Sequence, residues 1–200
     1  MKTGLIVLGV IVLIIIGGIG WAIGINNQLV AQEQAVNEKW AQVQNVYQRR
    51  ADLVPNLVET VKGFATQERT VLEEVTRARA NATGIQATPE LINDPVAFRK
   101  FQQAQAELGG ALGRLLVTVE RYPELKSNQN FLALQSQLEG TENRITVERQ
   151  RFNVAVRGYN EKVRRIPDSI VANVAGYRLK AFFEAAPDAA TAPKVQFGPK

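Results

Sequence analysis

The 200-residue sequence contains no cysteine, no histidine and only one methionine. Without imidazole and thiol groups it cannot build the usual zinc and copper sites, carry out thiol redox chemistry, or form a cysteine hydrolase or Ser-His-Asp triad. Carboxylates remain, but no acidic cluster has the spacing of a calcium or magnesium site or of a glycosidase pair. We therefore expect a protein that is not an enzyme and that needs no metal or cofactor.

The formal net charge of +5 comes mainly from one part of the chain. Residues 128–165 hold four acidic and seven basic side chains, whereas 26–80 and 81–126 are each balanced. A nucleic-acid-binding surface would combine such an excess with a known motif or with interleaved exposed aromatic side chains. A solvated helix face with basic side chains towards its C-terminal end fits better, so no nucleic-acid partner is expected.

An apolar run of 21 residues without a charge extends from Leu5 to Ile25. As a helix it spans the roughly 30 Å hydrocarbon layer of a membrane, and Trp21 is suited to the interface. The alternative is a cleaved signal peptide with Lys2 as its basic end. However, signal peptides have apolar stretches of about 7 to 15 residues, and no A-x-A site follows here. We predict a flank over 1–4 and a retained transmembrane helix over 5–25.

Two features of this segment bear on orientation and assembly. Lys2 precedes the run, and the first basic residue after it is Lys39, so the positive-inside rule places the remainder of the chain outside the cytoplasm. Gly20 and Gly24 form a small-xxx-small pair that would let two such helices approach closely. Glycine is common in membrane helices in any case, but the pair favours a homo-oligomer.

The stretch 26–184 has the three-four apolar spacing of amphipathic helices and no alternation of period two. It predicts a first long helix over 26 to about 80, kinked rather than broken at Pro55 because the apolar spacing continues across it. A second helix is expected from Asp94-Pro95 to Pro123, and a third from about Asn128 to Ile166-Pro167.

The predicted fold is therefore all-α: an N-terminal transmembrane helix followed by an antiparallel bundle of three long helices with short C-terminal helices. One or two short helices over 169–184 would close an open end of the bundle. The bundle covers 26–184, and residues 185–200, rich in proline and alanine, are interpreted as a flexible tail.

Polar residues recur at helical spacing on two of the predicted helices. Two such stripes would pair by charge-assisted hydrogen bonds and fix the helix register. Alternatively they form a groove for an anionic headgroup or a peptide, with Arg49, Arg50 and Arg149 as donors. The stripes are Arg49, Asp52 and Asn56 on the first helix, and Glu142, Arg149, Asn153 and Asn160 on the third.

Several of these residues lie in motifs that resemble a known family. The motifs are QRRADLVPNLV at 48–58, YPELKSNQNFL at 122–132, LEGTENRITVERQRFNVAVRGYN at 138–160, and Arg165-Ile166-Pro167. Together they are similar to the LemA family of bacterial envelope proteins over nearly the whole chain. The resemblance implies a long helical bundle behind one N-terminal segment in the bacterial inner membrane, with no established catalytic activity.

Three functions remain open at this point. The first is a self-associating scaffold of the envelope or membrane, and the second is a monomeric adaptor for another envelope protein, such as a membrane protease, or for an anionic ligand. The third is an acid–base enzyme using Glu142 or Glu148, which is weakest because carboxylates alone seldom assemble a site without a pocket or metal.

Overall fold

The computed structural model describes residues 2–65 and 67–184, and within them it contains helices and connecting segments but no strand. This confirms the all-α prediction. The predicted tail over 185–200 lies outside the described residues. The elements are α1 (Lys2–Phe64), α2 (Arg69–Gly84), the 3₁₀ turn η1 (Leu91–Asn93), α3 (Pro95–Val119), α4 (Pro123–Lys126), α5 (Gln129–Arg164) and α6 (Asp168–Ala175).

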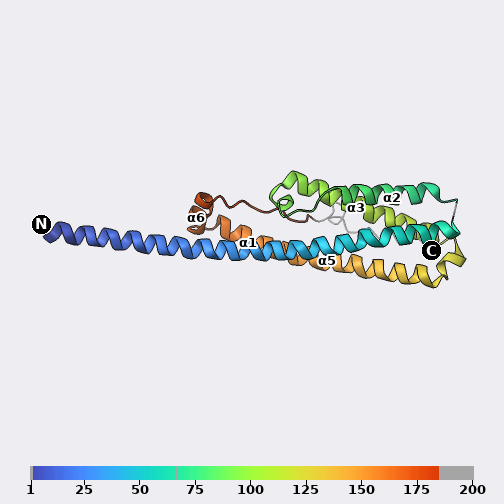
Figure 1. Cartoon of the computed structure of the whole chain (residues 1–200), viewed down its shortest axis with the longest axis horizontal. Helices are drawn as coiled ribbons and strands as arrows, with labels where there is room; N and C mark the ends of the chain where they lie inside the picture. Colours follow the sequence, from blue (N-terminus) through green and yellow to red (C-terminus); the bar gives the residue numbers. More distant parts are fainter. Residues whose placement is uncertain (1, 66, 185–200) are drawn as a thin grey trace, which may run out of the picture.

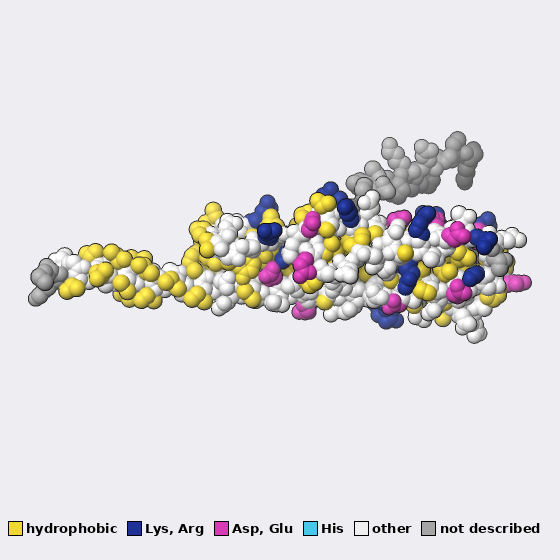
Figure 2. Space-filling model, turned by 45° about the horizontal axis from the view of Figure 1, so that its top comes forward, with side chains coloured by type: hydrophobic (Ala, Val, Ile, Leu, Met, Phe, Trp, Pro, Cys, Tyr) yellow, Lys and Arg dark blue, Asp and Glu magenta, His cyan; other side chains and the backbone are white. Residues whose placement is uncertain are grey.

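Helix α1 is 63 residues long and forms the axis of the molecule (Figure 1). Its N-terminal part extends beyond the other helices as an apolar rod (Figure 2). From Ile25 and Leu29 onwards its inward side chains are buried in the bundle. It is the one helix of the described chain that is long and apolar enough to cross a membrane.

The bundle core has two parts that follow one another along α1. The part nearer the N-terminal rod is aromatic, and Trp40 lies at its centre, with its ring centroid 5.7 Å from that of Phe98 and 5.4 Å from that of Phe152. The other part is mainly aliphatic and includes Leu57 and Leu115, with Phe131 as its buried aromatic residue. Aromatic pairs at such separations add packing energy beyond burial alone, so the two halves differ in chemistry.

The first helix ends at Phe64 rather than near Ala80, so the predicted length is wrong. The chain reverses between Phe64 and Arg69 into α2, which packs against α3 and α1. The described part of the bundle therefore contains four long helices instead of three. The sequence conceals this helix boundary because Val61, Ala65 and Leu72 are all buried and keep helical spacing across it. Apolar periodicity alone cannot distinguish a continuous helix from two helices joined in phase.

The other helix starts agree with their sequence signals. The Asp94 carboxylate accepts hydrogen bonds from the backbone N–H groups of the first turn of α3, which begins at Pro95, and the side chain of Asn128 does the same for α5. The expected short C-terminal helix is α6. Beyond Gly176, residues 177–184 are not helical, which corrects the expectation of helix up to 184.

Helix α1 continues through Pro55 without a break, as its apolar spacing predicts. Proline has no N–H, so the carbonyl of Ala51, four residues earlier, lacks its helical donor. Arg79 of α2 supplies a replacement: its Nε donates to the Ala51 oxygen at 2.8 Å. Pro55 thus leaves the Ala51 carbonyl free to accept the hydrogen bond that connects α2 to α1.

This arrangement predicts coupling between Pro55 and Arg79. Arg79→Met should lower the free energy of unfolding by about 1–2 kcal/mol, because a buried carbonyl loses its donor. In a Pro55→Ala background the restored helical N–H satisfies Ala51, so the same substitution should cost clearly less. Chemical denaturation of the four proteins measures the difference. Arg77→Met, at an exposed position, is the matched control; additive losses at 55 and 79 would contradict the coupling.

Candidate functional site

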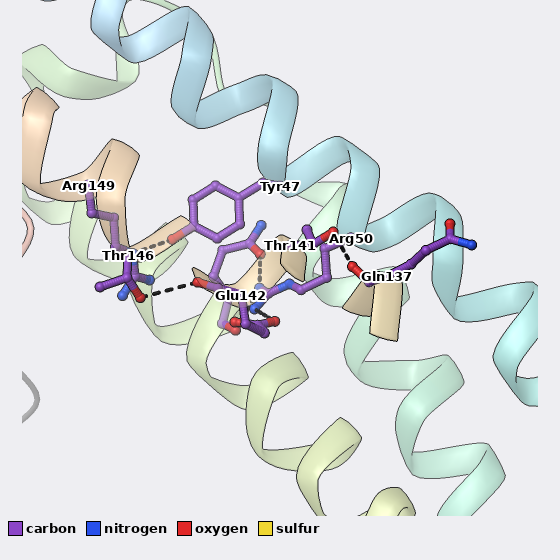
Figure 3. A network of polar contacts seen from close by, with 8 residues as sticks. Tyr47, Arg50, Gln137, Thr141, Glu142, Thr146 and Arg149 are labelled. Carbon is purple, nitrogen blue, oxygen red and sulfur yellow. Dashed lines mark hydrogen bonds and ion pairs between the residues drawn. The ribbon is translucent and has the colours of Figure 1, made fainter. Parts of the chain in front are cut away.

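A buried arginine lies where the two halves of the core meet. The Arg50 side chain is 3% exposed, and its Nη1 donates to Glu142 Oε1 of α5 at 2.9 Å (Figure 3). Its Nη2 donates to the backbone oxygen of Gln105 on α3 at 3.0 Å and to the side-chain oxygen of the same residue. One guanidinium therefore links three helices, and we call Arg50, Gln105 and Glu142 the polar layer.

The polar layer exists because polar residues lie at or beside core positions at one level of the bundle. On α1 the large inward side chains alternate at three and four residues, and Arg50 holds the place between two of them, beside the small, buried Ala51. Gln105 occupies the equivalent core position on α3. On α5 the core position is occupied by Thr141, and Glu142 lies beside it. The flanking core residues are Tyr47 and Val54 on α1, Phe101 and Leu108 on α3, and Leu138 and Ile145 on α5.

Arg149 of α5 lies on the aromatic side of the polar layer. Its Nε donates to the hydroxyl oxygen of Tyr47 at 2.5 Å, and its guanidinium carbon is 4.8 Å from the Phe183 ring centroid. Arg50 lies over the same tyrosine, 5.2 Å from the ring centroid. Burial raises the pKa of Tyr47, and the two arginines partly offset this. The tyrosine therefore stays protonated and acts as an acceptor between two cations.

Two asparagines of α5, one heptad apart, bind the C-terminal segment 177–184. Asn153 Nδ2 donates to the carbonyl of Phe183 and its Oδ1 accepts from the N–H of the same residue, both at 2.9 Å. Asn160 makes the equivalent pair with Lys180, also at 2.9 Å. Each amide replaces the two backbone hydrogen bonds that a neighbouring strand would give. We call Asn153 and Asn160 the asparagine clamp.

The clamped segment brings a buried lysine into the aromatic half of the core. Lys180 Nζ donates to Glu33 Oε1 of α1 at 2.6 Å and to Asn93 Oδ1 at 2.7 Å. It lies 5.4 Å from the ring centroid of Tyr159, whose hydroxyl donates to the carbonyl of Arg178. Burial raises the pKa of Tyr159 far above its usual value. The C-terminal segment is thus fixed to α1, η1 and α5.

Of the two predicted polar stripes, the one on α5 contacts other elements of the described chain and the one on α1 does not. Glu142, Arg149, Asn153 and Asn160 all contact other elements, whereas Arg49, Asp52 and Asn56 are exposed. Asp52 accepts from Gln48 on its own helix at 2.7 Å. The interpretation that these three residues face the α5 stripe is wrong, because successive helical residues are about 100° apart and Arg50, not Arg49, points inwards.

Sequence reasoning missed Arg50, Gln105 and Lys180 as organising residues. A signal for the first existed: the large buried side chains of α1 skip from Tyr47 to Val54, and position 50 completes their three-four alternation beside the small, buried Ala51. Gln105 likewise occupies a core position within an apolar heptad. No local signal marks Lys180, because its partners are distant in sequence. Gly20 and Gly24 lie on the projecting rod, where an added Cβ would meet no atom of the described chain within 4 Å.

The polar groups of the layer mainly satisfy one another. Glu142 is paired with Arg50, and Glu148, the other candidate acid, with Arg151 at 2.7 Å. Over residues 2–65 and 67–184, no three acidic side chains gather as metal ligands. A cavity of about 390 Å³ adjoins the layer and is lined largely by amide, hydroxyl and small apolar side chains of α1 and the 82–88 segment. The arrangement offers hydrogen bonds and a fixed charge, which suit positioning or binding.

Comparison with known proteins identifies the family. A family model described as the LemA family matches residues 39–197, a range that contains the polar layer and the asparagine clamp. The chain belongs to the LemA family. The match begins at Lys39, after the apolar rod, so the family signal lies in the bundle itself.

This LemA-family chain is also similar to curated proteins. It is 24% identical over 179 residues to magnetosome protein MamQ 2 of Paramagnetospirillum magneticum and 25% identical over 177 residues to MamQ of Magnetospirillum gryphiswaldense. These matches cover 80% of the chain but 65% of each relative, so the chain spans just under two thirds of their length. Protein LemA of Metamycoplasma hominis is 20% identical over 163 residues, covering 82% of the chain and 70% of that protein. None of these names denotes an enzymatic activity.

The polar layer predicts unequal effects at adjacent arginines. Arg50→Met should lower the free energy of unfolding by about 2–4 kcal/mol, because Glu142 and Gln105 lose a charged donor inside the bundle. Glu142 is 43% exposed and can regain water, which keeps the loss below that of a fully buried pair. Arg49→Met, at the exposed neighbouring position, should change stability by less than about 0.5 kcal/mol. Denaturant unfolding compares them; equal losses would contradict the assignment.

The asparagine clamp predicts local rather than global opening. Asn153→Ala with Asn160→Ala should speed amide hydrogen exchange at Lys180 and Phe183, whose N–H groups lose their acceptors, while the N-terminal half of α5 stays protected. Hydrogen–deuterium exchange with peptide mass analysis measures this. Asn143→Ala, at an exposed position of α5, is the control. Unchanged exchange over 180–183 in the double variant would refute the clamp.

Proposed function

We propose that this LemA-family protein is a single-pass protein of the bacterial inner membrane, and that its non-enzymatic bundle self-associates as a structural element of the envelope. The N-terminus would lie in the cytoplasm and the bundle on the periplasmic or extracellular side, as the position of Lys2 suggests. The observation that carries the proposal is the continuity of α1, which runs from the apolar rod into the bundle core without a linker.

The continuity of α1 has a mechanical consequence. Ile25 ends the apolar run and is already buried in the bundle, as is Leu29 one turn later. With the rod embedded in a membrane, the bundle could not swing on a flexible tether. Residues 26–64 would extend the helix roughly 60 Å from the membrane segment. Such a rigid post suits spacing or assembly, and the mutual pairing of its buried polar groups gives no support to acid–base catalysis.

Two surface features favour self-association. The face of the rod around Gly20 and Gly24 offers open space for the close approach of a second helix. On α5, Val147 and Val154 are exposed one heptad apart and border a shallow groove beside Lys39 of α1. The rod and the bundle therefore each have a surface on which a second copy of the chain could pack.

A second candidate function is that of an adaptor, and a different groove favours it. A groove of about 810 Å³ lies between α1 and α2, at the end of the bundle far from the rod. Val58 and Leu72 contribute apolar surface to it, and charged side chains such as Glu59 and Arg69 border it. An extended or helical segment of another envelope protein would fit this combination.

The mass of the full-length protein in mild detergent separates the two functions. We expect a discrete oligomer, measured by size exclusion with light scattering. Gly20→Ile with Gly24→Ile should shift most of the protein to smaller species, because a branched side chain prevents close helix approach. Gly18→Ile lies on the opposite side of the helix from Gly20 and should leave the mass unchanged. A monomeric wild-type protein would contradict self-association and favour the adaptor.

A further inference from the structure

Helix α6 lies beside α1 at the end of the apolar run. Its inward residue, Ala172, is fully buried in the same cluster as Ile25 and Leu29 of α1. Just after α6, the Tyr177 hydroxyl is 3.1 Å from Asn26 Oδ1. Lys162, near the end of α5, donates to Gln28 Oε1 at 2.6 Å. These contacts place α6 within about one helical turn of the point where the apolar run ends.

The outer face of α6 is apolar. Ile170 and Val174 lie two residues before and after Ala172, about 200° around the helix, and so point away from the bundle. Their side chains are 60% and 88% exposed, and the preceding Ile166 is 79% exposed. Val171 is partly buried beside Ala172, but a short helix that exposes its other two branched apolar residues is unusual for a surface that meets only water.

Basic side chains are in excess in the part of the chain that carries this apolar face. Residues 157–178 contain five basic and two acidic side chains. Lys162 is neutralised by Asp168, with 3.3 Å between Nζ and Oδ2. Arg164 and Arg165, at the end of α5, are exposed, and no carboxylate of the described residues lies within ion-pairing distance of either. Figure 2 shows apolar and basic atoms together at this end of the bundle.

We propose that Ile166, Ile170 and Val174, together with Arg164 and Arg165, form a membrane-surface platform that binds anionic lipid headgroups. This inference rests on the proposed membrane anchor. The headgroup layer is about 5–8 Å thick on each side of the hydrocarbon core, and one helical turn rises about 5.4 Å. With residues 5–25 in the hydrocarbon, α6 lies at headgroup depth. There its aliphatic side chains enter the acyl boundary and the guanidinium groups contact phosphates.

The size and charge of the platform favour lipid over a second protein. A stable protein interface buries about 800 Å² on each partner, far more than three aliphatic side chains supply. The same three side chains are sufficient as an addition to an existing anchor, because the membrane is already in contact with the neighbouring rod. Exposed arginines beside a lipid-facing apolar patch match an anionic surface, whereas a second copy would bring the same positive charge against them.

The absence of native cysteine allows a direct depth measurement. Full-length protein carrying Ile170→Cys, labelled with a fluorophore, is reconstituted into phosphatidylcholine vesicles with or without phosphatidylglycerol. Lipids with a nitroxide on the headgroup should quench this label. The matched control is Val117→Cys, 72% exposed at the far end of α3, which should not be quenched. Ile14→Cys, within the rod, should be quenched by a nitroxide placed deep in the acyl chain.

The role of charge is tested in the same vesicles. Arg164→Gln with Arg165→Gln should reduce the docked fraction of the position-170 label, by about fivefold in the docked-to-undocked ratio for each arginine. The reduction should appear with phosphatidylglycerol and be small without it. Arg77→Gln with Arg144→Gln removes two exposed arginines elsewhere and should have no effect. Thermal unfolding should be unchanged in all variants, because every substituted side chain is exposed.

The outcomes distinguish the platform from the anchor. If the label at 14 is quenched and the label at 170 behaves like that at 117, the platform is wrong and the anchor stands. If the label at 14 is not quenched, the anchor itself fails, and with it the platform. If the label at 170 becomes shielded with increasing protein density and its quenching does not depend on anionic lipid, the surface contacts a second copy and the platform is refuted.

Discussion

The buried guanidinium of Arg50 is the constraint on which the bundle depends. A cation inside a helical core is costly unless its donors find acceptors. Here both terminal nitrogens of Arg50 find them on α3 and α5, whereas its buried Nε has no partner among the described residues. Sliding either helix by one turn, about 5.4 Å, would remove these acceptors. An apolar core could accommodate such a slide by repacking, whereas the polar layer cannot. The layer therefore selects one register among several that hydrophobic packing alone would allow.

The fixed register also organises the C-terminal end of the chain. Arg149 lies one heptad after Glu142, and Asn153 and Asn160 continue on the same side of α5, so the level of Arg50 sets the level of the asparagine clamp. The clamp holds residues whose backbone has no helical or sheet partner, and this brings Phe183 against Trp40 and Lys180 against Glu33. The aromatic half of the core is thus completed by a segment held in place through side-chain amides rather than secondary structure.

Much of the fold follows from the sequence, and each miss has a physical reason. The all-α class and the starts at Asp94 and Asn128 depend on local chemistry, so they were predictable. The boundary between α1 and α2 was not predictable, because apolar spacing continues across it. The three-four spacing of Arg49, Asp52 and Asn56 predicts that Arg49 faces α5. The inward residue is instead Arg50, which continues the alternation of large buried side chains between Tyr47 and Val54. The segment 177–184 is predicted as helix and is not helical, because its hydrogen-bond partners lie on α5, α3 and η1, where no local pattern reveals them.

The same register connects the core to the position of the membrane-proximal surface. Because α1 is continuous, the core level at Arg50 and the end of the apolar run at Ile25 are separated by a fixed helical length. Helix α5 is locked to α1 by the polar layer, so its C-terminal end and α6 reach a defined height beside Ile25. Lys162 and Tyr177 bond to Gln28 and Asn26 at that height. A change at Arg50 would therefore act beyond local stability, because a shift of α5 along α1 displaces α6 by the same distance relative to the end of the rod.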